Sequence, residues 1–138
     1  MSILIVEDNP TNGLILRHLL KKVYSGDIHV IEDPLQALEI CQLQMFKLIV
    51  VDQMLPRISG VQFVRFLRHM PNFVSTPIVM VTGDSDPRVR AEAVSAGVSQ
   101  FLLKPVEAIS FRNMVSQLTI DAAHYCTTKE RVLQIAGV

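Results

Sequence analysis

The sequence predicts an α/β domain built on a doubly wound, five-stranded parallel sheet, and three observations lead to this prediction. Five short, mostly apolar runs rich in β-branched residues recur along the chain, and amphipathic stretches with helical spacing separate them. Short runs of this kind are typical of strands that are buried on both faces. Regular alternation of strand and helix indicates a parallel sheet with helices on both sides.

Each expected strand is a run of three to four residues. The first expected helix has apolar residues at intervals of three and four from Leu16 to Val23. Pro34 and Pro87 each follow an aspartate, which is typical of an N-cap followed by proline at the first helical position. The expected strands are residues 3–6, 29–31, 48–51, 78–81 and 101–103, and the further helices are residues 34–43, 60–69, 87–95 and 107–120.

Composition narrows the class of protein. The 138 residues suit one compact domain, and 13 basic residues balance 13 acidic ones, so charge gives no sign of direct nucleic-acid binding. The two cysteines do not suggest a disulfide framework, which favours a reducing, cytoplasmic setting. The N-terminus lacks the features of a signal peptide, and no apolar run approaches the length of a membrane span.

Polar side chains follow four of the five expected strands. Glu7 and Asp8 come after the first strand, Asp52 after the third, Thr82 after the fourth and Lys104 after the fifth. Ligands of such sheets bind beyond the carboxyl ends of the strands, so these groups should converge. Three acids held together repel one another unless a cation joins them, and an all-oxygen ligand set suits Mg²⁺.

Each of these residues also has an ordinary structural explanation. Asp8 precedes an Asn-Pro pair and could serve only as a turn or cap residue, Thr82 could be a turn hydroxyl, and Lys104 could be a solvated charge. Taken singly, these explanations are the simpler ones. Taken together they require every polar group to fall by coincidence at the same end of a different strand, which favours a functional site.

Four segments of the chain carry a resemblance to the receiver domain of two-component response regulators. It extends over residues 2–120 and all five strand–helix units, and it implies the flavodoxin-like strand order 2-1-3-4-5. The four segments in this order, with the motifs Asp-x-Met-x-Pro and Lys-Pro, are far more specific evidence than the pair of acids after the first strand. The matching segments are ILIVEDNP at 3–10, LIVVDQMLPRISG at 48–60, PIVMVTG at 77–83 and AGVSQFLLKP at 96–105.

The resemblance implies a role for each acid. Asp52 would accept a phosphoryl group from a sensor histidine kinase or a histidine phosphotransfer protein. Asp8, Asp52 and the backbone carbonyl of Met54 would bind Mg²⁺, and Glu7 would act largely through a metal-bound water. The chain would then be a signalling phospho-acceptor that catalyses only its own phosphorylation and dephosphorylation.

The resemblance also implies a switch. Thr82 and Lys104 would each bind a phosphoryl oxygen, and Phe101 would turn inward as Thr82 moves. The Lys104–Pro105 peptide would be cis. The face made by the fourth helix, the last strand and the last helix would change shape and control an output domain, a partner or a homodimer.

Two positions are expected to tune the lifetime of the phosphoryl group. Met54 lies two residues after the acceptor and Asp84 two residues after Thr82. Met54 cannot orient a water strongly and should slow hydrolysis, whereas Asp84 could accept a hydrogen bond from water or pair with a cation such as Arg57 or Arg88.

The expected domain boundary lies near residue 120. Residues 1–120 would form the receiver domain, and residues 121–138 would form a helical extension or a linker toward an output domain. Two alternatives remain open at this point: a hydrolase with an aspartyl-phosphate intermediate, and a receiver that only docks partners. Met54 stands where the hydrolases carry a second Asp, and retention of the acceptor set argues against the docking alternative.

Overall fold

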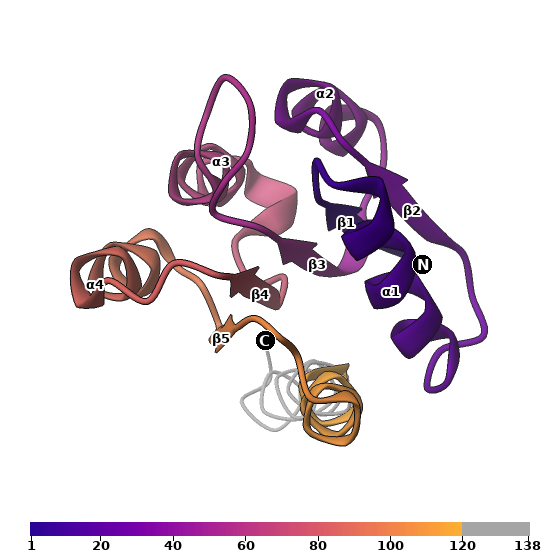
Figure 1. Ribbon diagram of the computed structural model, residues 1–138. Coiled ribbons are helices and arrows are strands. Elements are labelled where there is room, and N and C mark those ends of the chain that lie inside the picture. Colours follow the sequence, from indigo (N-terminus) through magenta and orange to yellow (C-terminus); the bar gives the residue numbers. More distant parts are fainter. Residues whose placement is uncertain (120–138) are drawn as a thin grey trace, which may run out of the picture.

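The structure, a computed structural model, describes residues 1–119 and confirms the predicted five-stranded parallel sheet with the strand order β2-β1-β3-β4-β5 (Figure 1). The expected extension at residues 121–138 lies outside the described residues. Residues 108–119 are helical and are called the last helix below. The other elements are β1 (Ser2–Val6), α1 (Pro10–Lys21), β2 (Ile28–Ile31), α2 (Pro34–Leu43), β3 (Phe46–Val51), α3 (Gly60–Arg68), the 3₁₀ helix η1 (Pro71–Phe73), β4 (Ile78–Thr82), α4 (Pro87–Ala96) and β5 (Gln100–Leu103).

Helices cover both faces of the sheet because successive strand residues point to opposite sides. Ile3 and Ile5 belong to a buried cluster with residues of α1 and the last helix. Leu4 and Val6 belong to a second buried cluster with residues of α2, α3 and α4. Figure 1 shows these two groups of helices on opposite sides of the sheet. The near-continuous apolar runs of the strands thus reflect burial on both faces.

Capping residues set the starts of the helices. Asp33 and Asp86 accept backbone hydrogen bonds at the starts of α2 and α4, and each is followed by proline, as predicted. Ser59 forms a capping box with Gln62 at the start of α3. This box fixes where α3 begins, and therefore the length of the loop that follows β3.

Two elements differ from expectation. Val23 lies beyond the end of α1 and is partly exposed, because the helix stops at Lys21. β5 is not a buried strand: Gln100 and Leu103 are exposed, and the two residues between them are half-buried. The strand order places β5 at the edge of the sheet, where it has one neighbour instead of two. Within the described chain, no helix combines the length and apolar character that crossing a membrane requires.

Candidate functional site

Backbone hydrogen bonds hold the polar residues at the carboxyl ends of the strands. The amide of Glu7 donates to the carbonyl of Ile31 at 3.1 Å, and the amide of Asp52 donates to the carbonyl of Val6 at 3.1 Å. The amide of Lys104 donates to the carbonyl of Thr82 at 2.8 Å. The sheet pairing therefore extends just beyond the strands, which fixes where these side chains begin.

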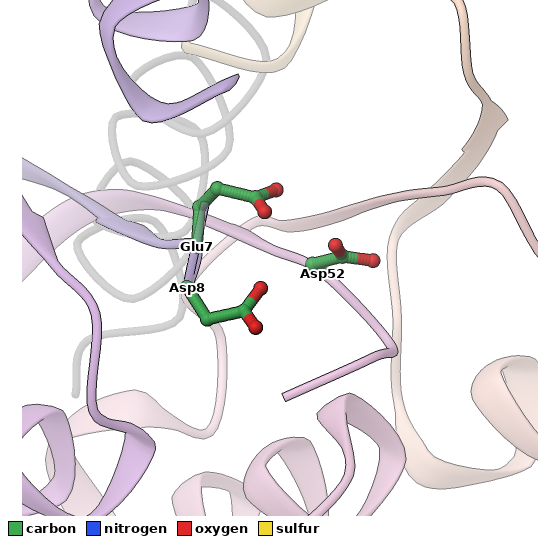
Figure 2. Close-up of side chains that lie close together, drawn as sticks. All are labelled: Glu7, Asp8 and Asp52. Atoms are coloured by element: carbon green, nitrogen blue, oxygen red, sulfur yellow. The ribbon is translucent and has the colours of Figure 1, made fainter. Parts of the chain in front are cut away.

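Three carboxylates meet at this edge of the sheet. One oxygen atom each from Glu7, Asp8 and Asp52 lies within 4.8 Å of the others. Glu7 is 1% exposed and Asp52 is 5% exposed, whereas Asp8 is exposed. Figure 2 shows the side chains of Glu7 and Asp8 directed toward the side on which Asp52 lies. The cluster is thus buried on the β1 and β3 side and reaches solvent at Asp8.

Lys104 joins two of the three acids. Its Nζ atom donates to Oε2 of Glu7 and to Oδ2 of Asp52, each at 2.9 Å. The Lys104 side chain is 23% exposed, so this ammonium group is largely enclosed. An enclosed ammonium between two buried carboxylates offsets part of their mutual repulsion.

The protonation equilibria of the site reflect burial together with these contacts. Burial raises the pKa of Glu7, and the hydrogen bond from Lys104 offsets this only in part, while the charge of Asp52 adds to the rise. Burial alone would lower the pKa of Lys104, but hydrogen bonds and charge from Asp52 and Glu7 outweigh burial and raise the pKa. Lys104 is therefore held as a cation.

The donor set fits a hard divalent cation. Its ligand atoms are oxygens only, and Mg²⁺ binds through a few carboxylates while it keeps several waters. Lys104 occupies one oxygen each of Glu7 and Asp52, and no side-chain hydrogen bond to Asp8 is present within residues 1–119. Asp8 is also the exposed member of the cluster, so a hydrated ion has access to it.

The loop after β3 packs tightly around Asp52. The amide of Met54 donates to Oδ1 of Asp52 at 3.3 Å, and the amide of Gly60 donates to the carbonyl of Gln53 at 2.9 Å. A Cβ atom on Gly60 would lie 2.2 Å from the carbonyl oxygen of Asp52, closer than any real contact. Glycine at this position therefore allows the start of α3 to rest against the backbone of Asp52.

The loop after β4 forms a second set of local contacts. Thr82 is fully buried, and its Oγ1 atom accepts a hydrogen bond from the amide of Asp84 at 3.2 Å. Oδ1 of Asp84 accepts from the amide of Asp86 at 3.0 Å. Pairing of Asp84 with Arg57 or Arg88, which the sequence left open, is not what the structure shows. Arg57 pairs instead with Asp33 from another loop, and Arg88 pairs with Asp86 two residues before it.

Phe101 lies on the edge strand β5 and is half-buried against the cluster that contains α3 and α4. The guanidinium carbon of Arg90 lies 5.7 Å from the centre of its ring, a cation–π distance. The peptide bond between Lys104 and Pro105 is cis. Phe101 therefore lies next to α4, on the face of the sheet that α2, α3 and α4 cover.

Sequence reasoning missed Gln53 and Arg68, and it missed the partner and the backbone conformation of Arg57. Gln53 accepts a hydrogen bond from the amide of Val61 through Oε1, which ties the loop after β3 to α3. Arg57 has a φ angle of 72° and pairs with Asp33 across two loops. Arg68 donates to backbone carbonyls after α4, at the end of η1 and just before β4. Of these three residues, only Arg57 could have been noticed in the sequence, because it is a cation in the loop that follows Asp52.

Comparison with known proteins places this chain in a family. Residues 3–116 match the response regulator receiver domain, and the chain belongs to that family. Its members are signalling domains that accept a phosphoryl group, so the fold and the site define a phospho-acceptor and not an enzyme with an external substrate. This decides against the hydrolase alternative.

Two curated relatives show how far the similarity extends. The cyclic di-GMP phosphodiesterase response regulator RpfG of Xanthomonas campestris pv. campestris is 31% identical over 137 residues. The match covers 98% of this chain and 36% of RpfG. The autoinducer 2 sensor kinase/phosphatase LuxQ of Vibrio vulnificus is 32% identical over 125 residues, with 91% of this chain and 14% of LuxQ covered. The chain thus spans only a minor part of either relative.

A solved structure gives an independent comparison. The receiver domain of the sensor histidine kinase PA1611 from Pseudomonas aeruginosa superposes with a TM-score of 0.77 and 25% identity. The match covers 86% of this chain and 96% of that one. That structure has a magnesium ion coordinated in its active-site cleft.

Proposed function

We propose that Asp52 is the phosphoryl acceptor of this receiver domain and that a sensor histidine kinase or a histidine phosphotransfer protein is the donor. The observation that carries this assignment is the ammonium of Lys104, held 2.9 Å from Asp52 and from Glu7 beside a cluster of three acids. A cation already in place at a buried carboxylate prepares that carboxylate to meet an anionic phosphoryl group.

Glu7, Asp8, Asp52 and the backbone carbonyl of Met54 would hold Mg²⁺, with Glu7 acting largely through water. When bound, the ion neutralises charge on the transferring phosphoryl group. The fit of the all-oxygen donor set supports this assignment, as does the magnesium ion in the PA1611 receiver domain.

The residues of the chain carry out the transfer. An oxygen of Asp52 forms a bond to phosphorus as the bond from phosphorus to the donor breaks, and the electron pair of that bond goes to the leaving atom. Lys104 exchanges its contact with Asp52 for a phosphoryl oxygen. Thr82 turns its hydroxyl toward another phosphoryl oxygen, which draws the end of β4 inward.

The inward movement of Thr82 would be coupled to Phe101. In the structure, Phe101 is half-buried beside α4 and in contact with Arg90. The contact with Arg90 stabilises its present position, and its partial exposure allows the ring to become more buried when it turns inward. Its rotation would reshape the face formed by α4, β5 and the last helix. That face would then change its affinity for an output domain, a partner or a second copy of the chain.

The wider context is also a proposal. Residues 121–138 would connect the domain, whose boundary we place at residue 120, to an output domain in a cytoplasmic protein. The relatives support the presence of further domains in a longer protein, because the matched receiver is only 36% of RpfG and 14% of LuxQ. Light scattering of the phosphorylated and unphosphorylated chain would test self-association, and an unchanged mass would exclude a phosphorylation-dependent homodimer.

The acceptor assignment is tested by intact mass spectrometry. With a small phosphodonor and Mg²⁺, the wild-type chain should gain one acid-labile phosphoryl group, and Asp52→Asn should gain none while it keeps its fold by circular dichroism. A full phosphoryl adduct on Asp52→Asn would refute the assignment. No adduct on the wild type would favour the alternative of a receiver that only docks partners.

A further inference from the structure

The acid cluster meets solvent at Asp8, because Glu7 and Asp52 are buried. Two surface pockets open at this point, and both are lined by Asp8 and Arg57. Arg57 therefore lies where the pockets meet, beside the route by which a ligand reaches the acids. The other lining residues are Gln53, Met54, Leu55, Pro56, Ile58 and Ser59 in the first pocket, and Glu32, Asp33 and Pro56 in the second.

The backbone at Arg57 is strained. Its φ angle is 72°, and it is the one non-glycine residue with positive φ among residues 1–119. The amide of Ile58 donates to the carbonyl of Pro56 at 2.8 Å, so Arg57 is the central residue of a three-residue γ-turn. Glycine adopts such a conformation freely, whereas a residue with a side chain does so at a cost in free energy. The turn thus presents an arginine at a position whose backbone favours glycine.

The contact that Arg57 makes is easily exchanged. Its guanidinium pairs with Asp33 at the start of α2, and the two side chains are 61% and 32% exposed. Exposed ion pairs contribute little net free energy, so a competing anion can displace Asp33. Oδ1 of Asp33 meanwhile caps α2 through the amide of Leu35. Asp33 therefore keeps a structural role when the guanidinium leaves.

The charges around the two pockets disfavour an anion except at Arg57. Their ionisable lining residues within the described chain are Asp8, Glu32 and Asp33, all acids, and Arg57, the one cation. A phosphodonor carries a phosphoryl group with nearly two negative charges toward these acids. A guanidinium binds phosphate oxygens with paired hydrogen bonds, which sets orientation as well as contact.

We propose that Arg57 is a donor-binding residue, which releases Asp33 and receives the phosphoryl group of the donor at the mouth of the site. This inference rests on the proposed function of Asp52 as the acceptor. The recognised chemistry is a phosphoryl dianion, whether it comes from a small phosphodonor or from a phosphorylated histidine. Arg57 takes no part in the bonds that form and break at phosphorus.

The test measures the rate of phosphorylation against the concentration of phosphoramidate, at fixed Mg²⁺ and ionic strength. Arg57→Gly keeps the backbone conformation and removes the guanidinium. It should raise the half-saturating donor concentration by a factor of about 3–10, the range expected for an exposed charged hydrogen bond, and leave the maximal rate within about twofold. Arg57→Lys keeps the charge and should show a smaller rise.

Asp33→Asn is the matched control. Asparagine retains the cap on α2 but releases the guanidinium, so the half-saturating concentration should stay the same or fall. If Arg57 acted only by bracing the two loops through Asp33, this variant and Arg57→Gly would raise it equally. A change in the maximal rate without a change in the half-saturating concentration would likewise indicate that Arg57 acts only by bracing the loops.

The outcomes separate this inference from the function on which it rests. A wild-type adduct on Asp52 together with an unchanged half-saturating concentration in Arg57→Gly overturns the inference and leaves the acceptor assignment intact. An equal rise in Asp33→Asn and Arg57→Gly also overturns it. Absence of any wild-type adduct overturns both proposals. A rise confined to the Arg57 variants supports a donor-binding role.

Discussion

Gly60 shows how a single residue holds Asp52 in place. A methyl group at this position would meet the carbonyl of Asp52 at 2.2 Å, and that carbonyl is backbone with little freedom to move. Gly60→Ala should therefore lower the free energy of unfolding by about 1–3 kcal/mol, as overpacking does elsewhere. Urea unfolding followed by circular dichroism measures the change.

Gly83 provides the control for Gly60. Nothing lies within 4 Å of a Cβ atom built on Gly83, although it is also close to the site. Gly83→Ala should change the free energy of unfolding by no more than about 0.5 kcal/mol. Equal losses in the two variants would show that the contact with Asp52 is not the cause.

Met54 should govern how long the phosphoryl group survives. Met54 is 66% exposed and lines the pocket that opens at Asp8, and we expect it to cover the approach of water to Asp52. Met54→Asn replaces a thioether with an amide that can orient water. We expect hydrolysis about 3–10 times faster, a barrier difference of about 1 kcal/mol. Loss of phosphoprotein over time, at fixed Mg²⁺ and pH, decides this, and an equal or slower rate contradicts it.

Arg68, the last residue of α3, donates hydrogen bonds to backbone carbonyls of three other segments. It donates twice to the carbonyl of Gly97 after α4, at 3.1 and 2.7 Å, and to the carbonyls of Phe73 and Thr76 at 2.6 and 2.7 Å. No acid pairs with it within the described chain, and burial lowers its pKa. The Arg68 side chain thus satisfies backbone carbonyls after α4, at the end of η1 and just before β4.

Replacement of Arg68 by methionine should leave these carbonyls unsatisfied. We expect a loss of about 2–3 kcal/mol in the free energy of unfolding. Arg65→Met, an exposed position on the same helix, should cost no more than about 0.5 kcal/mol. Chemical denaturation of both variants gives the comparison, and similar costs would mean that Arg68 contributes only general packing.

At the scale of elements, the sequence allowed accurate prediction where local chemistry decides the outcome. Pro34 and Pro87 after aspartate mark helix starts through local hydrogen bonds, and both were confirmed. The exposure of β5 was missed although the expected strand order placed it at an edge, because the apolar run at residues 101–103 was interpreted as a buried strand. The partners of Asp84 were also missed, since its nearest donor is a backbone amide that only the folded loop presents.

The same distinction applies to the site. Its members could be predicted because parallel strands bring their carboxyl ends to one edge, so Glu7, Asp52 and Lys104 were bound to meet. The bridge that Lys104 forms between two acids in the absence of phosphate was not foreseen, because it depends on the enclosure of those side chains. The left-handed turn at Arg57 has no counterpart in residue preferences, which favour glycine there.

Across the whole molecule, phosphorylation should alter the β5 edge of the sheet and spare the β2 edge. Phe101 and α4 lie together at the β5 edge, whereas β2, with α2 beside it, lies at the opposite edge of the sheet. Hydrogen–deuterium exchange should change in residues 87–103 and the last helix on phosphorylation and stay constant in β2 and α2. Asp52→Asn treated with the same donor is the control. Unchanged exchange in residues 87–103 of a fully phosphorylated chain contradicts the coupling.

The ion pair between Glu7 and Lys104 spans 97 positions of the chain. Contacts this distant form late in folding, after the intervening strands have paired. During synthesis, Glu7, Asp8 and Asp52 leave the ribosome long before Lys104 does. A nascent chain therefore carries the three acids without their cation, and competence to receive a signal arrives only when the edge strand closes the sheet. Completion of the fold and readiness to respond are, for this domain, the same event.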